Sequence, residues 1–254
     1  MAAPAGGGIR MKRRVLLAGL VAAPPLLAGH GAAAGAQMPL PDDFAFNTGP
    51  LEAVQEAVRR GTLTVVAAVG PVLSREAARD PASIYPNQVV TRLRQAWPKV
   101  TVTLGLLPIA NAETVQFSQL LSVGLAQYKP ALVIWGAGGT AAARGDDLDS
   151  FHGQVHDAIQ AVQTAGANLI LMTPQYAPMV ARLLNLPPYR QAVLQEAQQE
   201  GIPVLDRYEL LHFWNDNAIL DLDATDPVVQ ASVARIVNEW IAEILADGII
   251  RAVG

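Results

Sequence analysis

The feature that most constrains the fold is a regular alternation, from Leu51 to the C-terminus, between short apolar runs and longer segments with helical periodicity. This alternation is typical of βαβ units, in which helices cover both faces of a parallel sheet. We therefore predict an α/β fold, a three-layer α/β/α sandwich around a central parallel sheet of five strands. Leu63–Val69 is expected to be a central strand, and the other four are expected at Val100–Leu107, Ala131–Trp135, Asn168–Met172 and Pro203–Leu205.

Helices are predicted between these strands and at both ends of the series. The last helix has the clearest end signals, because Asp226 can cap it, Pro227 suits its first turn, and Gly248 is expected to follow its last turn. The others are expected at Leu51–Arg60, Tyr85–Trp97, Ala112–Tyr128, Asp149–Ala165 and Tyr189–Glu200.

Residues 1–36 have the pattern of a secretory signal peptide. Four basic residues precede or open an apolar run, Val15–Ala36, that contains no acidic residue. Ala34-Gly35-Ala36 supplies a small-x-small cleavage pattern, so we expect cleavage near Ala36 and a mature domain of residues 37–254. An uncleaved membrane anchor is the alternative, which Pro24-Pro25 and four glycines disfavour.

Two details of export stay open. Translation starts at Met1 or at Met11, since Met11 opens a compact signal by itself. Arg13-Arg14 fits both a general signal and a twin-arginine signal. Either route predicts a periplasmic or secreted protein, with no transmembrane span after cleavage.

Charge and cysteine content exclude several classes of function. The chain has 18 Lys+Arg and 22 Asp+Glu, and four of the basic residues but no acidic one lie in residues 1–36, which leaves 14 against 22 after cleavage. A protein with this acidic balance has no basic surplus for binding nucleic acid, so no nucleic-acid partner is expected. The absence of cysteine excludes disulfides, thiolate nucleophiles and Cys-ligated metals. No cofactor is expected.

In an open parallel sheet, the ligand crevice lies beyond the carboxyl ends of the strands, where the strand order reverses. The segments that follow the expected strands are therefore the places to look for a site. They are Gly70–Ser74, Gly136–Ala141 and Thr173–Pro178, together with Asp221–Pro227 before the last helix.

These segments, in their order and spacing, resemble the blocks of the SGNH or GDSL-type hydrolases in their exported bacterial form. Ser83–Pro86 is similar to the Tyr-Pro helix after the family's first block, and Lys129–Trp135 with Gly138–Thr140 is similar to its Gly-x-Asn-Asp region. Leu171–Pro178 and Asp206–Tyr208 occur in the same order in such proteins. The resemblance runs from about residue 63 to the C-terminus and implies a flavodoxin-like SGNH-hydrolase fold.

The family's reaction is acyl transfer by a Ser-His-Asp arrangement, and this chain departs from it at two positions. Val72 stands where the family has its nucleophile. Asp223 to Pro227 match the family's Asp-x-x-His-Pro block, with Asp226 in the place of the histidine. A carboxylate lacks the basicity of imidazole near neutral pH, whereas an Asp before a Pro is what a helix start requires. These positions predict a scaffold that has lost the reaction.

The oxyanion-stabilising positions are also altered. Thr140 replaces the family's asparagine, although its hydroxyl can still donate one hydrogen bond, and Gly105 is a candidate for the second-block glycine. Tyr176, with Trp135, Tyr85 and Trp214, could form an aromatic wall, although most such residues belong to the core. The expected ligand-binding residues are Gly70, Val72, Gly138, Gly139, Thr140 and Tyr176.

A rearranged active site is the main alternative. Ser74 would lie about 6 to 7 Å from the nucleophile position if the segment is extended. His212 is the histidine after residue 36 that is best placed to reach the crevice, so the pair could act as nucleophile and base. This arrangement requires two independent relocations.

His152 and His156 form a weaker candidate site. They lie four residues apart, on one face of a predicted helix, where Asp149 or Asp157 could complete a set of metal ligands. A solvated polar face explains the same pattern, and no metal site is predicted.

The sequence therefore predicts an exported protein of the cell envelope that keeps the SGNH scaffold and has lost catalysis. Its expected partner is a small acyl or sugar ester in the old substrate pocket, or another envelope component. An active serine esterase with a rearranged site is the alternative function.

Overall fold

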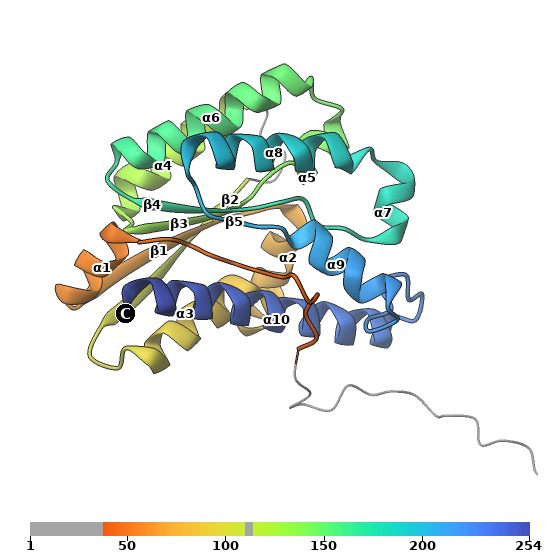
Figure 1. Ribbon diagram of the computed structural model, residues 1–254, viewed down its shortest axis with the longest axis horizontal. Coiled ribbons are helices and arrows are strands. Elements are labelled where there is room, and N and C mark those ends of the chain that lie inside the picture. Colours follow the sequence, from red (N-terminus) through yellow and green to blue (C-terminus); the bar gives the residue numbers. More distant parts are fainter. Residues whose placement is uncertain (1–37, 110–113) are drawn as a thin grey trace, which may run out of the picture. The chain divides into compact units, whose positions relative to one another are not determined.

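The computed structural model describes residues 38–109 and 114–254, so the predicted signal peptide lies outside the described residues. Met38–Gly254 form one compact unit. Its centre is a parallel sheet with the strand order β2-β1-β3-β4-β5, and helices cover both faces of the sheet (Figure 1). This is the predicted three-layer α/β/α sandwich, with the flavodoxin-like strand order.

The five strands form where the sequence predicts them, within one residue at each end. Their side chains are mostly buried, as expected for strands with helices on both faces. β1 lies second in the sheet and pairs with β2 and β3, so β3 is the middle strand. The bounds are β1 (Thr62–Val69), β2 (Thr101–Pro108), β3 (Leu132–Gly136), β4 (Asn168–Met172) and β5 (Val204–Leu205).

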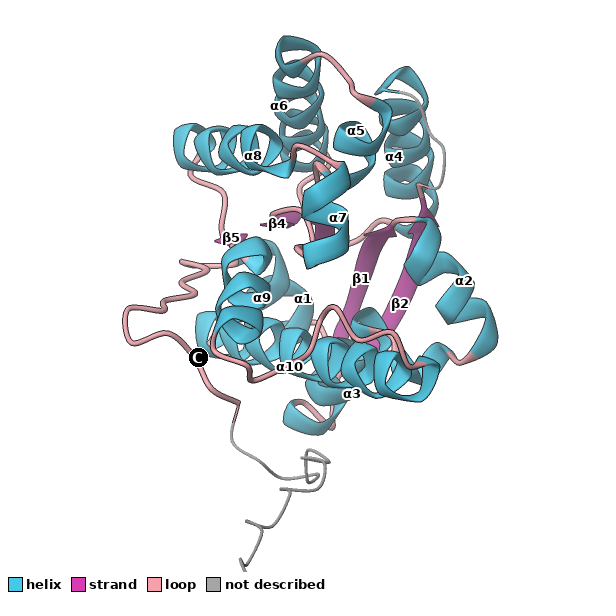
Figure 2. Ribbon diagram, turned by 90° about the vertical axis from the view of Figure 1, so that its right-hand side faces the viewer, coloured by secondary structure: helices cyan, strands magenta, loops and turns pink. Residues whose placement is uncertain are grey.

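The helices lie in two layers (Figures 1 and 2). One layer contains α1 (Glu52–Arg59), α3 (Tyr85–Ala96), α9 (Arg207–Asp216) and α10 (Pro227–Val253). The other contains α4 (Thr114–Tyr128), α5 (Gly139–Arg144), α6 (Leu148–Thr164) and α8 (Leu186–Glu200). Among the described residues, no helix combines the length and hydropathy that a membrane crossing requires.

Several short helices escaped the sequence analysis. They are α2 (Pro71–Arg79), α5, α7 (Pro178–Leu183) and α9, with the 3₁₀ turn Pro81–Ser83. Each is ten residues or shorter, so its apolar residues do not repeat often enough to establish a helical period. All four helices follow the carboxyl ends of strands or precede the last helix, and they shape the crevice.

Alternating side chains of the strands build the two cores. On β1, Leu63 and Val65 pack with the layer of α3 and α10, whereas Val66 and Ala68 pack with the layer of α4 and α6. Successive side chains of a strand point to opposite faces, so a single apolar strand supplies both cores. The rigid sheet then holds the strand ends at one edge.

The prediction that Gly248 ends the last helix is wrong. α10 continues through it to Val253. A Cβ atom at position 248 would lie 2.5 Å from the Phe46 ring, and Thr48 donates a hydrogen bond to the Gly248 carbonyl at 3.2 Å. Glycine is therefore required here by the close packing of the segment before α1, because any larger residue would collide with it.

Candidate functional site

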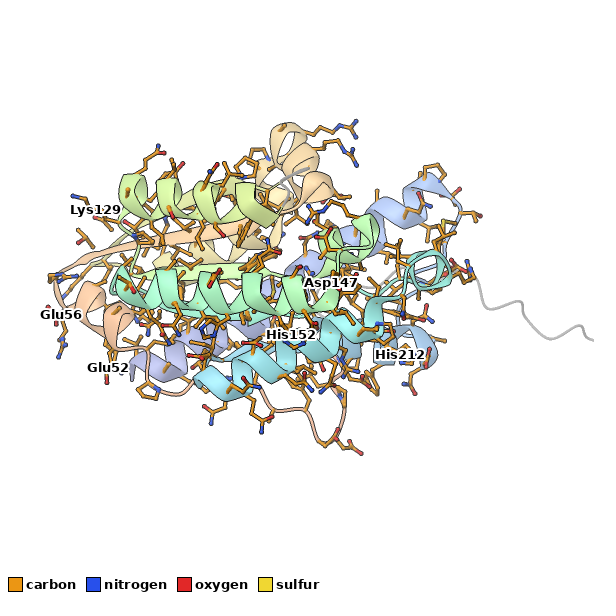
Figure 3. All side chains as sticks on the ribbon, turned by 90° about the horizontal axis from the view of Figure 1, so that it is seen from above. Glu52, Glu56, Lys129, Asp147, His152 and His212 are labelled. Carbon is orange, nitrogen blue, oxygen red and sulfur yellow. The ribbon has the colours of Figure 1, made fainter. Side chains whose placement is uncertain are left out.

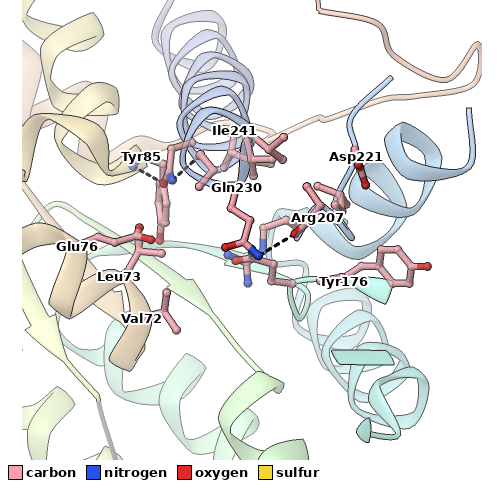
Figure 4. Close-up of a pocket in the computed structure, with 17 residues that line it drawn as sticks. Val72, Leu73, Glu76, Tyr85, Tyr176, Arg207, Asp221, Gln230 and Ile241 are labelled. Carbon is pink, nitrogen blue, oxygen red and sulfur yellow. Dashed lines mark hydrogen bonds between the residues drawn. The ribbon is translucent and has the colours of Figure 1, made fainter. Parts of the chain in front are cut away.

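Two adjoining cavities open at the carboxyl ends of β1, β3 and β4. The larger has a volume of about 560 Å³ and is lined by Val69 and Gly70 after β1, by Gly136 at the end of β3, and by parts of α5 and α7. The smaller, of about 250 Å³, lies among α2, α3 and α10 (Figure 4). They lie where the strand order reverses, between β1 and β3, which is the usual ligand position in such sheets. The two cavities share Val72, Leu73, Tyr85, Gln175, Ala177 and Arg207.

Val72, which the resemblance places at the nucleophile position, lines both cavities and is 56% exposed. Its side chain has no atom that can attack an acyl carbon. The expectation that Ser74 follows on an extended segment is wrong, because residues 71–79 form α2. Residues two apart in a helix are separated by about 200° around its axis, so position 74 lies on a different side of α2 from Val72.

The glycines after β3 shape the floor of the crevice. Gly138 has a φ of 89°, and a Cβ atom there would lie 2.8 Å from Pro174, so only glycine fits. Gly139 and Thr140 line the larger cavity, while Gly138 and Thr140 line a small pocket beside it. Gly105 does not reach the crevice: it lies inside β2, where a Cβ atom would come within 2.9 Å of the Tyr128 ring.

The acidic residues before α10 are engaged in local contacts. Asp226 accepts hydrogen bonds from the amides of Val228 and Val229 at 2.8 and 3.1 Å, as a helix cap does. Asp223 accepts two hydrogen bonds from Arg182, both at 3.1 Å. The carboxylate of Asp226, the residue expected in the place of the family's base, is therefore a helix cap.

Asp226→Ala is expected to lower the free energy of unfolding by about 1 kcal/mol, because two amides of α10 lose their acceptor. Asp226→Asn should leave stability nearly unchanged, since asparagine caps a helix as well as aspartate does. Urea denaturation followed by circular dichroism measures both. Equal losses for the two variants would contradict the capping role and show that the charge itself is required.

His212 lies on α9 (Figure 3). It does not belong to the residues that line the two cavities. Its ring is 4.8 Å from that of Tyr176 and 6.1 Å from that of Tyr208, centroid to centroid. Its Nδ1 is 3.4 Å from a carboxylate oxygen of Asp216. The imidazole is therefore held in an aromatic and ionic cluster behind Tyr176, which itself lines the smaller cavity.

His152 and His156 hold two helices together. His152 Nδ1 is 2.8 Å from a carboxylate oxygen of Glu196, and His156 Nδ1 is 3.4 Å from one of Glu200. These contacts connect α6 to α8. In the described ranges 38–109 and 114–254, no group of three or more His, Cys, Asp or Glu side chains is arranged to hold a metal ion. The pair therefore has a structural explanation.

Of the four aromatic residues expected to form a wall in the crevice, only the two tyrosines line the two described cavities. Tyr85 and Tyr176 line the smaller cavity. Trp135 stacks on Phe117 with centroids 4.4 Å apart, and it borders only the small pocket beside the main crevice. Trp214 is fully buried against Trp240.

Arg207, which lines both cavities, was not predicted as a site residue. It is the first residue of α9, two residues after β5. Its Nη2 would lie 3.2 Å from a Cβ atom at Gly136, so the guanidinium lies over the end of β3. Its position directly after the last strand, within the segment Asp206–Tyr208 that resembles the family, could have indicated that it belongs to the site.

Burial governs the ionisation of Arg207 and of its neighbour Tyr85. Burial raises the pKa of Tyr85 to about 12, although the charge of Arg207 works in the opposite direction. Burial also lowers the pKa of Arg207, and Tyr85 partly offsets this effect. Arginine remains protonated at neutral pH even so, and Tyr85 is then neutral. The crevice therefore contains a cation that Tyr85 does not neutralise.

The backbone beside Arg207 is fixed by a hydrogen-bond network. Thr173 donates from its hydroxyl to Asp206 at 2.8 Å, and the same hydroxyl accepts a hydrogen bond from the Tyr208 amide at 2.9 Å. Asp206 also accepts hydrogen bonds from Arg190. These contacts hold both neighbours of Arg207, so the direction in which it enters the crevice is well determined.

Solved structures of an esterase, a lipase/acylhydrolase and TesA share this fold. A two-domain esterase (CEX) active on acetylated mannans has a TM-score of 0.62 and 13% identity, over 82% of this chain and 54% of that one. The lipase/acylhydrolase from Enterococcus faecalis has a TM-score of 0.53 and 16% identity, over 74% of this chain and 96% of that one. TesA has a TM-score of 0.52 and 20% identity, over 70% of this chain and 97% of that one. These identities establish a common fold alone.

The sequence comparisons identify the family. No significant match was found among curated proteins. One protein family, described as the Non-GDSL lipase-like family, matches residues 37–254, which include every strand and helix described above. The chain therefore belongs to the Non-GDSL lipase-like family.

Proposed function

We propose that this protein binds a small ligand in the crevice without hydrolysing esters. The proposal depends above all on the residues at the two positions that resemble the family's nucleophile and base, because these residues cannot perform its reaction. Val72 has no nucleophilic atom, and the carboxylate of Asp226 caps α10. The crevice nevertheless keeps a volume typical of ligand sites.

The ligand contacts are proposed at the mouth of the larger cavity. Gly70, Val72, Gly139 and Thr140 line it, and Tyr176 lines the adjoining smaller one. The Thr140 hydroxyl supplies a hydrogen-bond donor where the family has its asparagine. Small residues here leave room for an acyl group or a sugar ester, which are the ligand classes we propose.

The proposed location is the periplasm or the exterior of the cell. Residues 1–36 carry the basic start, apolar run and small-x-small pattern of a cleaved signal. An export route would place the binding protein in the cell envelope, where acylated and acetylated glycans are potential ligands or partners.

Hydrolysis of short-chain aryl esters by the purified chain tests the proposal. We expect no turnover above the uncatalysed rate and no covalent labelling by an organophosphorus serine trap. Ser74→Ala and His212→Ala are the matched variants, because they remove the two members of the rearranged site. Both should behave like the unmodified chain in the assay.

A single result would overturn this proposal. Turnover that is lost in both variants, with the trap attached at Ser74, would show that the protein is a serine esterase with a relocated nucleophile. Mass spectrometry of the labelled peptide locates the trap.

A further inference from the structure

Arg207 stands out among the arginines of the crevice because no carboxylate of the described residues pairs with it. Arg144, on the rim of the larger cavity, pairs with Asp146. Arg190, which lies on α8 outside the lining of both cavities, pairs with Asp206 and Glu209. The Nε of Arg207 is buried and has no hydrogen-bond partner in the described part of the chain.

An unpaired guanidinium in such a position is costly for the free protein. Arg207 is partly exposed to the cavities, but its Nε is buried and has lost its hydration, and neutral Tyr85 does not compensate the charge. The Nε has no exposed surface, so a ligand in the cavity would meet the outer N–H groups of the guanidinium, of which Nη2 lies beside Gly136. A guanidinium presents its N–H groups in a planar fork, which matches an anionic oxygen pair.

The surroundings of Arg207 restrict the rest of the ligand. Much of the lining of the larger cavity is apolar and comes from the end of β1 and from α7 and its surroundings, including Val69, Val180, Leu184 and Leu186. A ligand that fills the cavity therefore needs an apolar part next to its charged group.

The charge of the ligand is restricted as well. Glu76 and Asp221 line the smaller cavity, into which Arg207 also extends (Figure 4). A second negative charge on the ligand would be repelled by these carboxylates. The described lining contains no second unpaired cation that could balance it. One guanidinium matches one negative charge.

We infer that the crevice binds an apolar monocarboxylate, with its carboxylate held by Arg207 and its apolar chain in the larger cavity. This inference rests on the proposed function and names the charge of the ligand, which that proposal leaves open. The Gly136 position, which lacks a side chain, keeps the approach to the guanidinium free.

Calorimetric titration of the purified chain with octanoate, methyl octanoate and octyl phosphate tests the inference. Octanoate should bind most tightly, since the ester lacks the charge and the phosphate carries too much of it at pH 8. Arg207→Met should weaken octanoate binding by at least about 10-fold, because a charge-assisted hydrogen-bonded pair is lost. Arg235→Met, which removes an exposed arginine of α10, is the control for net charge and should bind as the unmodified chain does.

A thermal melt separates a ligand-binding arginine from a structural one. Without ligand, Arg207→Met should unfold at the same temperature as the unmodified chain or a higher one, because an uncompensated charge has been removed. Arg207→Lys keeps the charge but loses the planar fork, and it should bind octanoate more weakly than the unmodified chain. If Arg207→Met does not fold, octanoate binding by Arg207→Lys tests the inference instead.

The outcomes are distinct. Octanoate binding no tighter than that of methyl octanoate, or unchanged by Arg207→Met, overturns the inference while a non-hydrolytic binding role stands. Tighter binding of octyl phosphate also overturns it, in favour of a dianion. Hydrolysis of methyl octanoate would instead overturn the proposed function, because an ester would then be a substrate.

Discussion

Trp214→Ala is expected to lower the free energy of unfolding by about 3–5 kcal/mol, the range for deleting a large buried aromatic side chain. Trp214 is completely buried, and its ring packs edge-on against Trp240 with centroids 5.0 Å apart. Its indole N–H donates a hydrogen bond to the Pro39 carbonyl at 2.7 Å. The variant would therefore open a cavity under α9 and also release the segment before α1.

Trp214→Phe separates the two contributions. It keeps an aromatic ring against Trp240 but loses the hydrogen bond to Pro39, so we expect a smaller loss of about 1–2 kcal/mol. Urea denaturation followed by far-ultraviolet circular dichroism gives both values, and limited proteolysis near Pro39 reports the release of the segment. A loss below about 1 kcal/mol for Trp214→Ala would contradict the burial of this side chain.

Asp206→Ala is expected to lower the free energy of unfolding by about 2–3 kcal/mol. The carboxylate accepts hydrogen bonds from Thr173, whose side chain belongs to a fully buried residue, and from Arg190. Removing it leaves a buried hydroxyl without its acceptor and a guanidinium with fewer partners. The expected loss is smaller than for a fully buried ion pair, because the pair with Arg190 is about one-quarter exposed.

Glu209→Ala is the matched control for Asp206→Ala. Glu209 also pairs with Arg190, at 2.9 Å, but its side chain is 54% exposed. Its removal should change stability by no more than about 0.5 kcal/mol. Equal losses for the two variants would show that the pairing with Arg190, and not the network around Thr173, carries the stability.

The sheet was predictable because its strands carry their own signal. Asn168–Met172 is a short apolar run between turn residues, and it became β4 with unchanged bounds. The start of α10 was predictable for the same reason, since Asp226 and Pro227 act within one turn. Such patterns are local. An apolar run of this kind predicts a strand reliably, because a strand that is buried on both faces must consist mainly of apolar residues.

The site was only partly predictable. The positions around Val72 and Thr140 were found from the resemblance, and the structure places both on the larger cavity. Arg207 was overlooked because an arginine after a strand is usually solvated and paired. Its burial depends on Gly136, which is 71 residues earlier in the chain, and on Tyr85 from α3.

The sequence by itself determined the alternation of strands and helices and the strand positions, and the resemblance predicted from it that Val72 and Asp226 stand at the reacting positions. Only the tertiary structure decided that α10 continues through Gly248, that His212 packs behind Tyr176, and that Arg207 enters the crevice without a carboxylate. The physical reason is range. Periodicity and capping act between residues a few positions apart, whereas close packing and the pairing of a buried charge depend on which distant segments the fold brings together.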